Sequence, residues 1–305
     1  MNKRLTKSEF LVAYMIIITL ACFVGGFFFG ARYMKAAMEE QQAAASQTEK
    51  QMLEQEKLLR EQKLYSEQDF IRFHYAVYAP LLELKQAHFD KMADWSRMDT
   101  QQRTDSLNQL VKAAKETIKQ LEKPAALTTA PLLNQSQSIF LDSVRAYLDS
   151  IEQLLSDQNS NILEPEEIAS RLTLSQNSWL KGQELLYQAL ALWESSYVTK
   201  QPMPKEAPKT LSIAQWKQYP FHYRTYLAAT ALTHHKQWTA YNPEDLTARL
   251  DMLMSSNEWQ SLGLQDVNAA LRLLTTADMV KVGDFKQLQL KLYPAVKTPE
   301  LPIFR

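Results

Sequence analysis

The strongest constraint on this chain is the segment 10–29, twenty consecutive residues without a charged side chain. In a helix that rises about 1.5 Å per residue, such a run spans about 30 Å, the thickness of a bilayer hydrocarbon core. A helix also satisfies its own backbone hydrogen bonds in lipid, so the pattern predicts one transmembrane helix over residues 10–30. Basic side chains flank the run at Lys3, Arg4, Lys7, Arg32 and Lys35.

Two processing signals share parts of this pattern. A cleaved signal peptide also begins with basic residues, but its apolar region is usually about 7–15 residues long. A lipoprotein signal would use Cys22, yet Thr19 and Leu20 stand where that motif wants leucine and a small residue. An uncleaved signal anchor agrees best with the length of the run, and cleavage or lipidation stays open.

The flanking charges predict the orientation of this segment. Residues 1–9 contain three basic side chains, whereas the first fifteen residues after the predicted helix contain two. By the positive-inside rule, residues 1–9 form a cytoplasmic tail and the body lies on the other side of the cell membrane. We therefore expect a single-pass membrane protein with an extracytoplasmic body.

Small residues recur every four positions in the predicted membrane helix, at Cys22, Gly26 and Gly30. They share one helix face, and the two glycines match the GxxxG pattern that lets membrane helices approach closely. A homodimer through this face is a hypothesis. Glycine is also common in membrane helices that do not dimerise, so the pattern alone is weak.

Residues 31–63 contain no glycine or proline and predict one helix that leaves the membrane. One heptad position carries Met38, Ala45, Met52 and Leu59, but the companion position is polar throughout, at Gln41, Thr48, Gln55 and Gln62. A stable two-stranded coiled coil needs both positions apolar. The segment is therefore either a weak coiled coil or a solvated single-helix stalk.

Residues 64–199 show four amphipathic stretches that predict an antiparallel helical bundle. The clearest stripe is Leu107, Leu110, Val111, Ala114, Ile118 and Leu121. Asp99 with Gln102 predicts a capping box at its start, and Pro165 with Glu166 predicts another helix start. Pro80 predicts a kink or a break in the first stretch.

Three prolines within residues 200–210 predict a semi-rigid linker and a domain boundary. Beyond it, residues 211–305 form a predicted α+β domain, with helices near 221–237, 243–258 and 264–278. Gly283 and Asp284 then favour a two-residue turn, and Leu288, Leu290 and Leu292 alternate with polar residues as in a half-buried strand. This is the element order of a winged helix, so the fold class is mainly α with one small β-hairpin.

The sequence contains no catalytic or cofactor motif. Its one cysteine, Cys22, excludes a disulfide within the body and a cysteine-based zinc site. The five histidines lack metal-ligand spacing, and Glu164, Glu166 and Glu167 stand at a helix start, where carboxylates favour the helix dipole. Five tryptophans at helical spacing (Trp179, Trp193, Trp216, Trp238 and Trp259) are typical of a core. We expect no enzyme, no cofactor and no metal.

Charge argues against nucleic acid as a partner. Lysine plus arginine equals aspartate plus glutamate, at 34 each. The predicted helix at 264–278 carries Arg272 against Asp266 and Asp278, whereas DNA binding needs several basic residues. The sequence thus predicts a non-enzymatic, membrane-anchored envelope protein that binds another protein or the cell wall. A sensor-type module with a small-molecule pocket in the bundle is the alternative.

Overall fold

The computed structural model describes residues 65–123, 125, 130–157, 164–204, 207–208, 211–256, 258–264 and 266–304, with 14, 15, 19, 20, 26 and 34. These belong mainly to one compact unit, Leu59–Arg305. The predicted cytoplasmic tail, nearly all of the stalk and most of the predicted transmembrane helix lie outside the described residues. In the part that is described, no helix is both long and apolar enough to cross a membrane.

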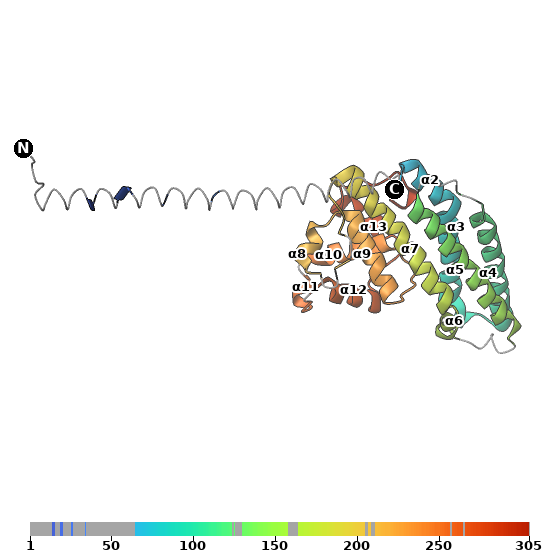
Figure 1. Ribbon diagram of the computed structural model, residues 1–305. Coiled ribbons are helices and arrows are strands. Elements are labelled where there is room, and N and C mark those ends of the chain that lie inside the picture. The colour runs from blue at the N-terminus through green and yellow to red at the C-terminus, as the bar shows by residue number, and fades with distance from the viewer. Residues whose placement is uncertain are drawn as a thin grey trace, which may run out of the picture. The chain divides into compact units, whose positions relative to one another are not determined.

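The first half of this unit is a helical bundle, as the sequence predicts, and the chain as described is mainly α-helical. Neighbouring helices of the bundle pack side by side, with α5 between α4 and α7 (Figure 1). The elements are α2 (Glu67–Phe73), the π-helix η1 (His74–Tyr78), α3 (Ala79–Asp94), the 3-10 turn η2 (Trp95–Arg97), α4 (Thr100–Leu121), α5 (Pro131–Ser156), α6 (Pro165–Arg171) and α7 (Thr173–Trp193).

Local sequence signals explain where several of these helices begin. Asp99 and Gln102 form the predicted capping box, in which each side chain accepts a backbone hydrogen bond from the other residue. Pro165 occupies the first turn of α6, as predicted. Pro80 lies in the first turn of α3, directly after η1. Proline has no amide hydrogen and breaks the normal ladder, and the π-helical turn before it absorbs that break.

The second half continues from α7 through shorter helices. α7 packs against α9 as well as α5, and α10 packs against α9 and α13 (Figure 1). The elements are the π-helix η4 (Glu194–Thr199), α8 (Ile213–Gln218), α9 (Phe221–His234), α10 (Pro243–Ser255), α11 (Glu258–Ser261), α12 (Val267–Thr276), α13 (Asp284–Leu292) and the 3-10 turn η5 (Pro302–Phe304).

The β-hairpin predicted near the C-terminus is wrong. Gly283 has a φ of +86°, as a hairpin turn would need, but it caps the start of helix α13. Phe285 and Leu292 pack into the core at helical spacing, whereas Leu290 is 88% exposed. A short run of leucine, glutamine and lysine fits the periodicity of a strand as well as that of a helix, and all three residue types favour helix. The described residues therefore lack a winged-helix order.

The segment between η4 and α8 contains no helix at residues 201–204 and 207–208. The largest apolar core includes residues from both sides of this segment, among them Phe140 in α5, Phe221 in α9 and Phe304 in η5. A second core surrounds Trp216 and Leu250 among the later helices. The predicted domain boundary at residues 200–210 stays a prediction.

Candidate functional site

A buried lysine joins the bundle to the later helices. Lys85 of α3 is 3% exposed. Its ammonium donates one hydrogen bond of 2.6 Å to Asn242 Oδ1 and another of 3.2 Å to the carbonyl oxygen of Tyr241. Asn242 is also the N-cap of α10 and accepts from the backbone of Asp245. One cation thus holds the start of α10 against the bundle.

A tyrosine pair extends this contact. The hydroxyl of Tyr187 in α7 donates a short hydrogen bond to Oε2 of Glu244 in α10. The hydroxyl of Tyr78, from η1, lies 3.3 Å from that of Tyr187. Since the Tyr187 hydroxyl uses its one hydrogen in the bond to the carboxylate, the Tyr78 hydroxyl is the donor in the hydrogen bond between the two tyrosines. Three elements therefore meet at one carboxyl group that is itself only 4% exposed.

The ionisation of this cluster is tuned close to neutrality. Burial, reinforced by the neighbouring Asp245, raises the pKa of Glu244 to about 7. Burial lowers the pKa of Lys85 to about 8. Such groups can take up or release a proton near pH 7. They are enclosed by protein, however, so their evident role is to fasten α10 to the bundle. Tyr78, Lys85, Tyr187, Asn242 and Glu244 together form the Lys85–Glu244 cluster.

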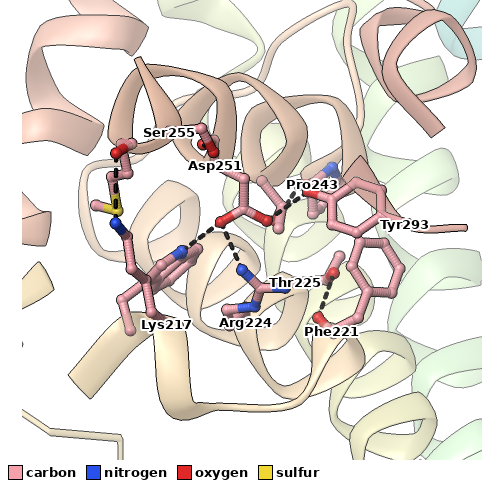
Figure 2. Close-up of polar contacts among 11 residues, drawn as sticks. Lys217, Phe221, Arg224, Thr225, Pro243, Asp251, Ser255 and Tyr293 are labelled. Atoms are coloured by element: carbon pink, nitrogen blue, oxygen red, sulfur yellow. Dashed lines mark hydrogen bonds and ion pairs between the residues drawn. The ribbon is translucent and has the colours of Figure 1, made fainter. Parts of the chain in front are cut away.

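A second buried carboxylate lies two turns further along α10. Asp251 accepts hydrogen bonds of 2.6 Å from Trp216 Nε1 and from Arg224, and a short one from the hydroxyl of Tyr293 (Figure 2). The Arg224 guanidinium also lies 5.8 Å from the ring centre of Trp216 and 6.0 Å from that of Tyr293. Asp251 thereby connects α8, α9, α10 and the chain after α13.

Two further aspartates fix the start of α13. Asp284 is 1% exposed and accepts two parallel hydrogen bonds of 2.7 Å from Arg249 of α10. Asp245 accepts a hydrogen bond of 3.0 Å from the backbone N–H of Phe285. Bidentate arginine pairs of this kind are among the stronger charge-assisted hydrogen bonds. These contacts explain why residues after Gly283 form a helix that packs on α10.

A cavity of about 300 Å³ lies beside η4, and its wall contains a buried carboxylate, Glu194. Oε2 of Glu194 accepts hydrogen bonds of 2.8 Å from His222 N–H and 3.3 Å from Tyr223 N–H, so it caps α9. Burial raises the pKa of Glu194 to about 7, against the opposing effects of these backbone donors and of Arg224. We call this space the Glu194 cavity.

A larger groove of about 530 Å³ runs between α9, α12 and the segment before α8. Its base contains Trp216 and Leu271, both buried, and its rim carries His234, His235 and Arg272, all exposed. Partial burial, together with the nearby His234 and Arg272, lowers the pKa of His235. The groove therefore combines an apolar base with charged and titratable residues around it, among them Asp266.

The predicted membrane-dimer face is largely outside the described residues. Gly26 is exposed and helical, and Cys22 and Gly30 are not among the described positions. The homodimer hypothesis stays a prediction.

The histidines lie in different environments. His74, His88 and His222 are buried, and His88 Nδ1 lies 3.0 Å from the hydroxyl of Tyr147. Within the described part of the chain, no three histidine, cysteine, aspartate or glutamate side chains are arranged to hold a metal.

The acidic residues around Pro165 act at a helix start. Glu164 is the N-cap of α6, and its amide donates to Glu167, while Glu166 lies in the first turn. Of the tryptophans considered in the sequence, Trp179, Trp193 and Trp216 are buried in the cores. Trp238 lies between α3 and α7, with its ring centre 4.8 Å from that of His88 and 5.6 Å from that of Trp179.

Comparison with known proteins gives no relative from which a function can be transferred. No protein-family model, no curated protein and no solved structure matches the chain. The function must therefore be inferred from its own geometry.

Sequence reasoning missed Lys85, Glu194 and Asp251 as buried charges. A lysine or a carboxylate in a helical pattern normally indicates a solvated face. The signal that existed was the spacing of Glu244 and Asp251, which are seven residues apart and so share a face of α10 with apolar neighbours. Nothing in the sequence indicates the partners of these buried charges. The side-chain partner of Lys85, for example, lies 157 positions away.

Proposed function

We propose that this chain is a non-enzymatic, membrane-anchored envelope protein whose extracytoplasmic helical body binds another protein or the cell wall. The uncharged segment at residues 10–29 supports the anchor. The basic tail before it supports the orientation.

One surface feature carries the proposal. Large apolar side chains are exposed along and just before α13, at Met279, Val282 and Leu290, with exposed fractions of 43%, 54% and 88%. Leu290 lies on the face of α13 opposite to the buried Phe285. The three positions lie within twelve residues of sequence, and exposed apolar side chains that form one surface are typical of a contact with a partner.

The orientation is tested by cysteine labelling. Cys22 is the only native cysteine, so the unmodified chain serves as background. Leu174→Cys introduces a thiol at a helical position that is 79% exposed. Labelling of intact cells by a membrane-impermeant maleimide supports an extracytoplasmic body. Labelling that requires lysis contradicts it.

Partner binding is tested by photo-crosslinking in intact cells. A photoreactive amino acid at Leu290 should form one discrete adduct, whereas the same residue at Lys112, exposed on α4, should not. Val282→Lys should lower the yield of the adduct at Leu290, because a charged side chain then replaces an apolar contact. No discrete adduct at Leu290, or an equal yield at both positions, contradicts the proposal.

A sensor-type ligand-binding module is the second candidate. The cavities beside η4 and between α9 and α12 favour it. Both include residues after the bundle, whereas the sequence places the expected pocket inside the bundle. A small molecule that raises the melting temperature of the purified chain would support this candidate over a purely protein-binding one.

A further inference from the structure

The Glu194 cavity has walls from three separate segments. The π-helix η4 contributes Glu194 and Ser195, the irregular segment after it contributes Pro202 and Met203, and the junction of α8 with α9 contributes Tyr219. π-Helical turns are rare and occur frequently at functional sites. Lys200, at the end of η4, adopts a left-handed conformation with φ of +53°, which non-glycine residues seldom adopt. The backbone that shapes this cavity is thus unusual at two consecutive points.

Glu194 is a buried carboxylate without an ion-pair partner among the described residues. Arg224 is the nearest basic group that affects it, but the Arg224 guanidinium is 2.6 Å from Asp251 and already forms an ion pair there. The imidazole of His222 packs against the rings of Trp193 and Phe304. Within the described part of the chain, the hydrogen-bond donors to the Glu194 carboxylate are backbone N–H groups.

The rest of the wall combines aromatic and apolar side chains with the polar residues Ser195, Thr199, Gln201 and Gln218. Tyr219 and Tyr223 both line the cavity, and their ring centres are 4.8 Å apart in an edge-to-face arrangement. The apolar part of the lining consists of Ala191, Pro202, Met203, Pro204 and Pro220. Aromatic faces attract cations, and quaternary ammonium groups in particular bind between aromatic rings and a carboxylate. A carboxylate beside aromatic rings is repellent to anions.

We propose that the Glu194 cavity binds a small organic cation of the ammonium class, with Glu194 as its counter-charge and Tyr219 and Tyr223 as its aromatic wall. This inference goes beyond the proposed partner-binding function and does not depend on the membrane topology. The volume, about 300 Å³, suits a compact ligand. A quaternary ammonium group is favoured over a metal ion, because the wall supplies one carboxylate beside two tyrosine rings, and a metal ion needs several charged or strongly donating ligands.

The test uses the purified full-length chain in an uncharged detergent and choline as the probe. Isothermal titration calorimetry should detect saturable binding of choline. The neutral carbon isostere of choline, 3,3-dimethylbutan-1-ol, should bind at least about tenfold more weakly, because it lacks the charge that Glu194 recognises. Equal affinity for both molecules, or no binding of choline, overturns the proposal.

Glu194→Gln is the central variant. Glutamine keeps an oxygen that accepts from His222 N–H, so the α9 cap survives, but the charge is lost. We expect choline affinity to fall at least about tenfold. The matched control is Glu164→Gln, which makes the same change at the exposed N-cap of α6 and should leave affinity unchanged. An equal effect of both changes would overturn the site.

A second variant and a proton measurement keep the test decisive. Tyr219→Leu should weaken the binding of choline about threefold, because it removes an aromatic ring but leaves Glu194 in place. Titrations at pH 6.5 in two buffers of different ionisation enthalpy should reveal proton release on binding, and this release should vanish at pH 8.5. The reason is that a bound cation forces Glu194 to ionise. Binding without proton release at pH 6.5 contradicts the role of Glu194.

Discussion

The ammonium of Lys85 and the side-chain oxygen of Asn242 are joined by a 2.6 Å hydrogen bond across 157 positions of sequence. Because Asn242 caps α10, this bond fixes the start of a helix of the second half from within the bundle. Glu244, two residues further along, is tied to α7 through Tyr187. The position of α10 therefore depends on polar contacts as well as on apolar packing, and polar contacts of this kind are specific in direction.

Lys85→Met should destabilise the fold by about 3–5 kcal/mol, because removing one partner of a buried charged cluster leaves the others unpaired. The carbonyl of Tyr241 and the amide oxygen of Asn242 would lose their donor. Urea unfolding of the purified chain, followed by circular dichroism, measures this change.

Lys112→Met is the control for that measurement. Lys112 is exposed on α4, and the same change there should stay within about 0.5 kcal/mol of the wild type. A cost at Lys85 no larger than that at Lys112 would show that the buried cluster contributes little to stability.

The unfolding free energy of the Glu244→Gln variant, relative to that of the wild type, should increase as pH rises from 5 to 8. The folded-state pKa of Glu244 is raised to about 7 from an ordinary value of 4.5, so its stabilising contribution is complete below pH 4.5 and is lost as pH rises through 7. Glutamine does not titrate. The difference in unfolding free energy between the two proteins should shift by up to about 3 kcal/mol over this range.

The quantity to measure is the difference in unfolding free energy between the Glu244→Gln variant and the wild type, rather than the pH dependence of the wild type alone. His88 and His222 are buried with pKa values lowered by burial to about 4 and about 3, so they destabilise the fold as pH falls below 6.5. Their effect runs opposite to that of Glu244 and is present in both proteins. A difference that stays flat between pH 5 and 8 would contradict a raised pKa at Glu244.

Short-range signals predict much of this fold, and long-range polar contacts escape them. The capping box of Asp99 with Gln102 lies within four residues, so the sequence reveals it. The partner of Lys85 lies far along the chain, and a lysine in a helical stretch is normally read as solvated. The Glu194 cavity depends on a π-helix and an irregular segment, for which sequence patterns offer little guidance.

The C-terminal leucines distinguish the observed helix from the hairpin that the sequence favours. In a strand, Leu290 and Leu292 would face the same side and cost the same when made polar. In α13, Leu290 is 88% exposed whereas Leu292 packs against the core. Leu290→Lys should therefore change stability by less than about 0.5 kcal/mol, and Leu292→Lys should cost about 2 kcal/mol. Equal costs in urea unfolding would favour the strand.

Gly182 sets how closely α5 and α7 approach each other. A Cβ atom added there would lie 3.0 Å from two ring atoms of Phe140, a side chain with no solvent exposure. The carbonyl of Gly182 also accepts a 2.7 Å hydrogen bond from Ser136 of α5, so the helices cannot separate freely.

Gly182→Ala should destabilise the fold by about 1–2 kcal/mol, because overpacking against Phe140 outweighs the gain of about 1 kcal/mol in helix propensity. Phe140→Leu removes the ring that the new methyl group meets. In that background, Gly182→Ala should become neutral or stabilising, and the double-mutant cycle measures this reversal by urea unfolding. The same cost in both backgrounds would mean that the two helices adjust without strain, and that another contact sets their spacing.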